Sequence, residues 1–206
     1  MVKKKSVKKI KGKSFSERLV SLYQDSWVIT RSSKNFILLI FFLFLFSALL
    51  GVLFPSWFEN TITDYLRDLV FNIDGLSFFE LFLFILKNNF TSSFFGVLTG
   101  LLFGIIPLVI TAVNGYVLGF VSVRTVEITG SGSVLLRLLP HGIFELPAVF
   151  ISLGLGLRIG YALFLSRSKA EFLSVFKDSF KALLFIVLPL LVLAALIESA
   201  LIIFFG

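Results

Sequence analysis

Cysteine is absent from this chain of 206 residues, and histidine occurs once, at position 141. The lack of cysteine excludes disulfides, thiol catalysis and cysteine-based metal sites. Any Ser-His-Asp triad would have to use His141, because the chain has no other histidine. The sequence also has neither a Walker loop nor the glycine fingerprint of dinucleotide-binding domains. Nothing in it indicates nucleotide-driven chemistry.

Charged residues are scarce as well, at 15% of the chain, whereas hydrophobic residues make up 57% and the mean hydropathy is +1.01. A membrane-spanning helix needs about 20 mainly apolar residues. Residues 36–54 contain no charge at all, and residues 182–205 contain one, Glu198. The composition therefore predicts an all-α protein: a polytopic transmembrane helical bundle with lipid as its solvent and no separate soluble domain.

The net charge of +7 comes from the first residues of the chain, where seven lysines equal the whole excess. They are Lys3, Lys4, Lys5, Lys8, Lys9, Lys11 and Lys13. A lysine arm ahead of a membrane span stays in the cytosol and contacts anionic lipid head groups, so we expect no nucleic-acid partner. Residues 14–33 are amphipathic and predict a helix along the cytoplasmic surface. We divide the chain into a basic cytoplasmic arm with an interfacial helix (1–34) and a transmembrane bundle (35–206).

The remaining charges predict how the chain crosses a cell membrane. Residues 58–75 carry four acidic residues against Arg67 alone, whereas residues 158–181 carry five basic residues against two acidic ones. The positive-inside rule places the first segment outside and the second in the cytoplasm. An odd number of crossings must connect them, and the apolar length between them favours three. We therefore expect about five spans, with the N-terminus inside and the C-terminus outside.

The middle of the chain leaves two arrangements open. The apolar stretch 94–123 would measure about 45 Å as one helix at 1.5 Å per residue, which exceeds a membrane core of roughly 30 Å. Pro107 lies near its middle and favours a break, so this stretch is either two closely apposed helices or one long broken helix. Residues 69–71 and 78–86 are apolar but short, and we expect them to be interfacial or re-entrant pieces. Residues 87–89 then interrupt the apolar run, and residues 91–93 offer helix caps.

Glycines recur at every fourth residue, a spacing that lets a second helix approach closely. The recurrences are Gly96, Gly100 and Gly104, and then Gly115 and Gly119. We interpret them as helix-packing positions within the bundle, and a homo-oligomeric interface is the alternative.

The segment Pro140-His141-Gly142-Ile143-Phe144-Glu145-Leu146-Pro147 places an imidazole and a carboxylate in apolar surroundings. A charged side chain at the centre of a bilayer costs roughly 2.5–3.5 kcal/mol or more. On a helix, His141 and Glu145 are four residues apart and share one face. Pro140 suits the first turn of a helix, and Pro147 would bend the helix just beyond Glu145.

Two further polar residues interrupt apolar runs, Asn114 and Glu198. Together with His141 and Glu145 they make a candidate buried polar cluster contributed by three helices. The cluster could cross-link helices by hydrogen bonds, line a path for a substrate or ion, or hold a divalent metal through His141, Glu145 and Glu198. The residues alone do not distinguish among these three roles, and they identify no catalytic residue. Apart from a possible divalent metal, no cofactor is evident.

Several of these features together resemble the stage II sporulation protein M family, over roughly residues 35–205. They are Asn88-Asn89, the glycines 96, 100 and 104, Asn114-Gly115 with Gly119, the block 140–148, and Pro189 with Ala194-Ala195 and Glu198. The resemblance implies a multipass protein. In spore-forming bacteria the family's namesake belongs to the engulfment machinery and holds partners that degrade peptidoglycan at the membrane. The lysine arm and the phenylalanine-rich spans fit a distant or archaeal-type relative.

Three functions remain open. The first, favoured by the resemblance, is a non-enzymatic membrane scaffold that positions other membrane or envelope proteins during envelope remodelling. The second is a transporter or channel with a path lined by His141, Glu145 and Glu198. The third is an intramembrane metalloenzyme, which requires those three residues to converge on a metal. The residues do not decide whether the protein is an enzyme, and a non-enzymatic role is favoured.

Overall fold

The structure, a computed structural model, describes residues 14–129 and 131–205, with the backbone alone for 128–129, 131–141 and 205. The lysine arm therefore lies outside the described residues. Throughout the described ranges the regular elements are helices, which confirms the all-α prediction. Five segments of this part of the chain are long and apolar enough to cross a membrane, as predicted. They are α2 (Lys34–Leu53), α4 (Phe78–Leu98), α5 (Ile105–Thr129), α6 (Ser131–Leu165), and the continuous run of α7 (Lys169–Ala182), π-helical η3 (Leu183–Val187) and α8 (Leu188–Phe205).

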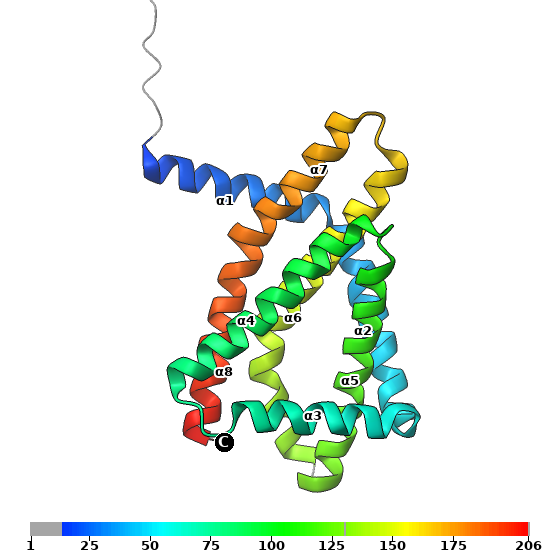
Figure 1. Ribbon diagram of the computed structural model, residues 1–206, viewed down its shortest axis with the longest axis vertical. Helices are drawn as coiled ribbons and strands as arrows, with labels where there is room; N and C mark the ends of the chain where they lie inside the picture. Colours follow the sequence, from blue (N-terminus) through cyan, green and yellow to red (C-terminus); the bar gives the residue numbers. More distant parts are fainter. Residues whose placement is uncertain (1–13, 130, 206) are drawn as a thin grey trace, which may run out of the picture.

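Two further helices lie across opposite ends of the bundle (Figure 1). One end carries α1 (Phe15–Ser32), which starts at a capping box in which the Ser14 backbone N–H donates to the Glu17 carboxylate at 2.8 Å. Arg158 of α6 holds the α1–α2 junction, because its Nη1 donates to Ser33 Oγ at 2.9 Å. The other end carries α3 (Glu59–Ile73), which follows the short 3₁₀ helix η1 (Pro55–Phe58). The helix predicted over residues 14–33 is confirmed, whereas α3 is longer than the short piece expected at residues 69–71.

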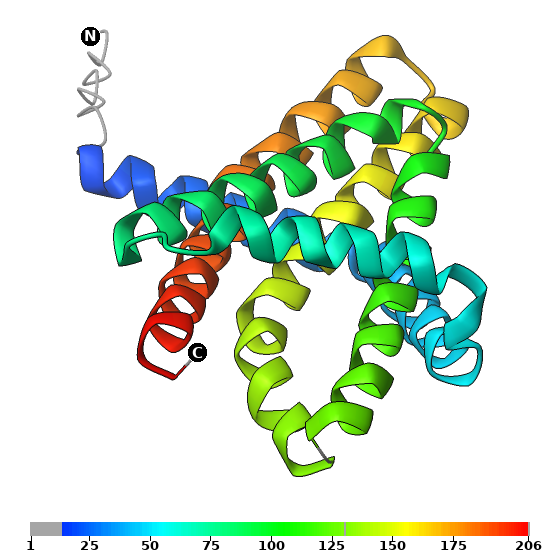
Figure 2. The same cartoon turned by 60° about the horizontal axis from the view of Figure 1, so that its bottom comes forward.

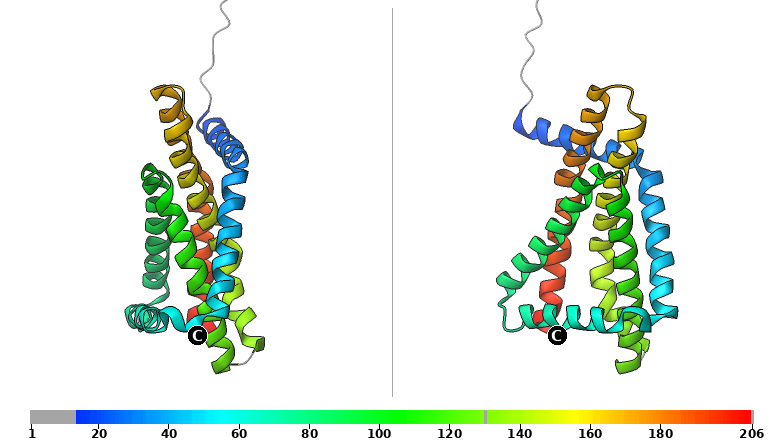
Figure 3. Two further views of the ribbon diagram at one scale, coloured as in Figure 1. Left: turned by 90° about the vertical axis from the view of Figure 1, so that its right-hand side faces the viewer. Right: turned by 45° about the vertical axis from the view of Figure 1, so that its right-hand side comes forward.

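The spans pack through positions that lack side chains. α2 runs along α5 (Figure 3), and Gly119 lies directly against the Ala48 carbonyl oxygen, while Gly115 faces the backbone of Phe44. On the other side of the bundle α6 packs against α4 and α8, around a core that includes Val97, Leu155 and Leu191. The close approaches leave no room for a Cβ atom at Gly119.

The expectation that residues 78–86 form a short, separate piece is wrong. α4 runs unbroken from Phe78 to Leu98, through the polar residues 87–93 that we expected to interrupt it and cap a helix. Glu80, which interrupts the apolar run, lies in the first turn, where its carboxylate accepts from the Ser77 backbone N–H at 2.9 Å. Asn89 and Ser93 are buried, so these polar residues face the protein and not lipid.

The stretch 94–123 belongs to two helices. The 3₁₀ helix η2 (Thr99–Leu101) and a turn at Gly104, where φ is +73°, separate α4 from α5. The break thus precedes Pro107, which lies in the first turn of α5, where a proline leaves no helical hydrogen bond unmade.

The expectation that a helix starts at Pro140 is also wrong, because α6 begins at Ser131 and continues through Pro140 and Pro147. His141 and Glu145 therefore lie inside a helix of 35 residues.

Candidate functional site

A cavity of about 350 Å³ lies between α4, α5 and α6. α4 and α5 come together at their hairpin and diverge towards α3, so that the two helices and α3 outline a triangle (Figure 1; Figure 3, right). α6 supplies the third wall, and α2 contributes Phe44. The lining combines apolar side chains with a set of polar ones, which are Tyr65, Asn88, Asn89, Ser92, Ser93, Asn114, Glu145 and Ser152.

Helix α3 covers one end of this cavity because of its amphipathic pattern. Ile62, Leu66, Leu69 and Ile73 recur at helical spacing and form its inward stripe. Ile62 packs against Tyr116 and Phe120 of α5, and Ile73 packs against Leu81 and Ile85 of α4. Leu66 and Leu69, between these two anchors, line the cavity.

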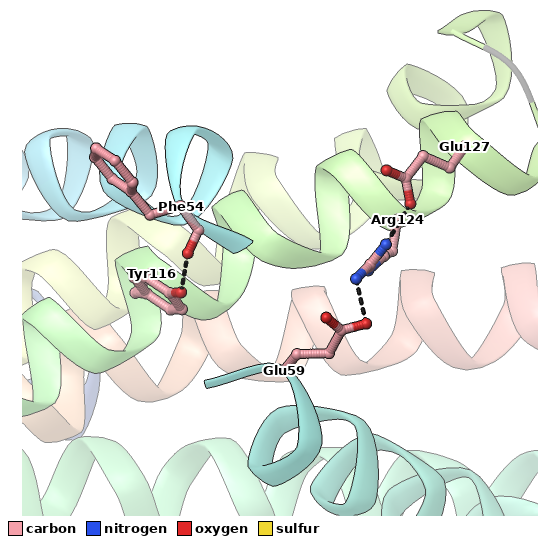
Figure 4. A network of polar contacts seen from close by, with 5 residues as sticks. All are labelled: Phe54, Glu59, Tyr116, Arg124 and Glu127. Atoms are coloured by element: carbon pink, nitrogen blue, oxygen red, sulfur yellow. Dashed lines mark hydrogen bonds and ion pairs between the residues drawn. The ribbon is translucent and has the colours of Figure 1, made fainter. Parts of the chain in front are cut away.

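Polar contacts attach the N-terminal end of α3 to α5 (Figure 4). Arg124 of α5 contacts the carboxylate of Glu59 on α3 and also that of Glu127, at 2.7 Å. Nearby, Tyr116 Oη donates to the Phe54 carbonyl oxygen at 2.5 Å, a group left open where α2 ends. Both contacts join the α2–α3 connection to α5.

Towards the α4–α5 hairpin, the backbones of η2 and α6 are in contact. Gly100 in η2 lies against the carbonyl oxygen of Gly156 on α6, and a Cβ at Gly96 would lie 2.8 Å from Leu153 Cδ2. α4 and α6 therefore meet on the side of the cavity that lies towards the α4–α5 hairpin.

The polar lining is divided between a buried floor and an exposed rim. Asn89, Ser93, Glu145 and Ser152 are buried, and they come from α4 and α6. Asn88, Ser92 and Asn114 are exposed, as is Tyr65 on α3. A ligand or water entering past the rim would reach buried polar groups on two helices.

The structure brings together part of the sequence-predicted cluster. Asn114 and Glu145 line the same cavity, whereas Glu198, half-buried on α8, is not among its lining residues. The side chain of His141 lies outside the described residues. Among the side chains that the structure describes, no group of three His, Cys, Asp or Glu residues could hold a metal ion, and the metal hypothesis depends on His141.

Sequence reasoning missed most of the floor. Asn89 and Ser93 are four residues apart on α4, and Ser152 follows Glu145 by seven residues on α6, so each pair shares a helical face. These spacings were available in the sequence, but the wrong break at residues 87–93 hid the first pair.

The helical spans and the intramembrane polar cavity define a multipass membrane protein. A model of the family described as "Stage II sporulation protein M" matches residues 38–201, and the chain belongs to this family. It is also similar to an uncharacterized protein of the archaeon Methanocaldococcus jannaschii, with 29% identity over 153 residues that cover 66% of this chain and 67% of the relative. No solved structure shows a significant match.

Proposed function

We propose that this protein is a non-enzymatic membrane scaffold. Through α3 it holds envelope-remodelling partners at the outer surface of the membrane that it spans. Family membership supports a multipass protein of this type. The observation that carries the proposal is the outward face of α3. Its inward stripe is used for packing, while Asp64, Asp68 and Phe71 on the other face are exposed.

The chemistry of that face suits a protein partner. Phe71 and Val70 are exposed apolar side chains at one end of the helix, next to Asp68 and Asp74. Buried apolar contact with a polar rim is the usual composition of a protein interface. A partner with a basic surface would complement the carboxylates. Because α3 is held at both ends, it would present this face without first having to fold.

The test is site-specific photo-crosslinking in native membranes. A photoreactive residue at Asp68 should capture one defined envelope protein, and the same residue at Leu193, which is exposed on α8, should not. The double substitution Asp64→Lys and Asp68→Lys should abolish capture by a crosslinker placed at Phe71, without lowering the amount of protein in the membrane. Equal capture at Leu193, or unchanged capture in the double variant, would contradict a scaffold acting through α3.

A transporter or channel is the second candidate, because a cavity with a buried carboxylate could serve as a binding site on a path. The backbone contact between Gly100 and Gly156, near the α4–α5 hairpin, argues against a continuous pore between α4 and α6. Flux through reconstituted vesicles, lost in Glu145→Gln and kept in Glu198→Gln, would favour transport over the scaffold.

A further inference from the structure

The floor of the cavity is polar and deeply buried. Glu145 is 7% exposed and Ser93 is 2% exposed, and they approach the cavity from α6 and α4. Asn89 and Ser152 complete the floor. Burying a polar side chain in a membrane protein is costly unless that side chain is hydrogen-bonded.

Among these floor residues, Ser93 gives the strongest indication of a bound ligand. Its hydroxyl is buried and finds no hydrogen-bond partner within the described part of the chain. The Ser152 hydroxyl, by contrast, donates to the Val149 carbonyl oxygen at 2.9 Å, which leaves its own oxygen able to accept. The oxygens of Ser93 and Ser152 can therefore accept hydrogen bonds from a ligand, and the Ser93 hydroxyl can also donate one.

The charged groups of the lining indicate the sign of the charge that a ligand would carry. Glu145 is the one residue with a formal charge among the described lining residues, which include no lysine or arginine. Among these described residues, a phosphate or carboxylate ligand would meet no compensating cation. A cation would meet a carboxylate, amide and hydroxyl oxygens, and the aromatic rings of Phe44 and Tyr65.

The walls of the cavity are apolar, so they favour a ligand that also has an apolar portion. Leu66 and Leu69 of α3 and Val117 of α5 line the cavity between the floor and the rim. The volume of about 350 Å³ lies in the range of small-molecule sites, roughly 300–1,000 Å³.

We propose that this cavity binds an organic cation, an amine whose ammonium group lies on the floor beside Glu145 and Ser93 and whose apolar portion lies against α3 and α5. The ligand enters past the exposed rim. This site is separate from the outward face of α3, so the proposal goes beyond the scaffold function and does not depend on it. Failure to bind amines would leave crosslinking at Asp68 unchanged.

The experiment uses the absence of cysteine from the chain. Ser92→Cys places a single thiol on the rim of the cavity in the full-length protein, purified in a maltoside detergent. Three probes share a six-carbon chain and differ in the head group: hexylammonium, hexanoate and hexanol. We expect hexylammonium to slow alkylation of this thiol in a saturable manner, and hexanoate and hexanol to leave it unchanged. Asn60→Cys, exposed on the outer face of α3, is the control thiol that no probe should protect.

Second substitutions in the Ser92→Cys protein locate the cation. Glu145→Gln should weaken protection by hexylammonium about tenfold or more, because a charge-assisted hydrogen bond is lost. Glu198→Gln is the matched control: another intramembrane carboxyl group, outside the lining, whose loss should leave protection intact. Ser93→Ala should weaken protection about threefold, and it tests the site independently if Glu145→Gln does not fold.

Three results would overturn the proposal. They are equal protection by all three probes, no protection by hexylammonium up to its solubility limit, and full protection in folded Glu145→Gln or, if that variant does not fold, in Ser93→Ala.

Discussion

Single residues set how closely the helices of this bundle approach one another. Gly119 touches the backbone of α2 at Ala48, whereas a Cβ at Gly142, also in a span, would meet one described atom within 4 Å, Leu146 Cδ1 at an ordinary contact distance of 3.7 Å. The same chemical change should therefore have opposite effects at these two positions.

We predict that Gly119→Ala destabilises the protein by about 1–3 kcal/mol, the usual cost of forcing extra atoms into a packed interior. Gly142→Ala should be neutral or stabilise by up to about 1 kcal/mol, because alanine restricts the unfolded chain. Thermal unfolding in detergent measures both. A Gly119→Ala protein as stable as Gly142→Ala would show that α2 and α5 are farther apart than the structure places them.

The hydroxyl of Tyr116 closes the end of α2 through the Phe54 carbonyl oxygen. Tyr116→Phe should cost about 0.5–1.5 kcal/mol, the net value of a typical hydrogen bond. Tyr161→Phe is the matched control, because Tyr161 is exposed and contacts Phe36 through its ring. Equal melting temperatures for the two variants would argue against the hydrogen bond.

Among the helices, α3 is the element on which both proposals depend, and its attachment is uneven. Its start is held by the ion pair of Glu59 with Arg124 and by Ile62, and its end is held by apolar contacts of Ile73 and Leu76 alone. The ion pair is partly exposed, and such pairs contribute at most about 1 kcal/mol.

Arg124→Gln should therefore loosen the first turns of α3 without unfolding the bundle. Hydrogen exchange of amides 60–64 should accelerate by up to about fivefold, corresponding to roughly 1 kcal/mol. Arg67→Gln removes an ion pair within α3, between Arg67 and Asp64, and should change exchange less. If the two variants exchange alike, Arg124 does not hold α3.

At this scale the sequence predicted the helices better than their ends. Apolar length was sufficient for five spans, and the amphipathic pattern was sufficient for the helix over residues 14–33. Of α3 only a short piece at residues 69–71 was expected, although the helix runs from Glu59 to Ile73. The ends of α4 were missed because residues 87–93 look polar enough to end a span. Four of them, Asn88, Asn89, Ser92 and Ser93, line a cavity instead of facing lipid, and a cavity between three helices is a tertiary feature that no single segment encodes. Asn114 and Glu145, which were predicted as site residues on the cost of placing polar groups in a membrane, line the cavity, and the grouping of His141 and Glu198 with them stays a prediction.

For the whole molecule, a scaffold that acts through α3 requires α3 and the cavity rim to face outwards. The α6–α7 connection must then face the cytoplasm. In sealed right-side-out vesicles, a membrane-impermeant thiol reagent should label Asn60→Cys and leave Arg167→Cys unlabelled until the vesicles are opened. The reverse pattern would invert the topology and remove the basis for an outward scaffold.

The central claim is that the molecule contains a hydrated polar cavity within the membrane, reached past its rim. Asn114 and Val113 are neighbours on α5 and both are exposed, but Asn114 lines the cavity and Val113 does not. In sealed right-side-out vesicles, the impermeant thiol reagent should react with Asn114→Cys, and Val113→Cys, which faces lipid, should remain unmodified. Equal protection of both thiols would contradict the account, because it would mean that the cavity is not open to water from outside.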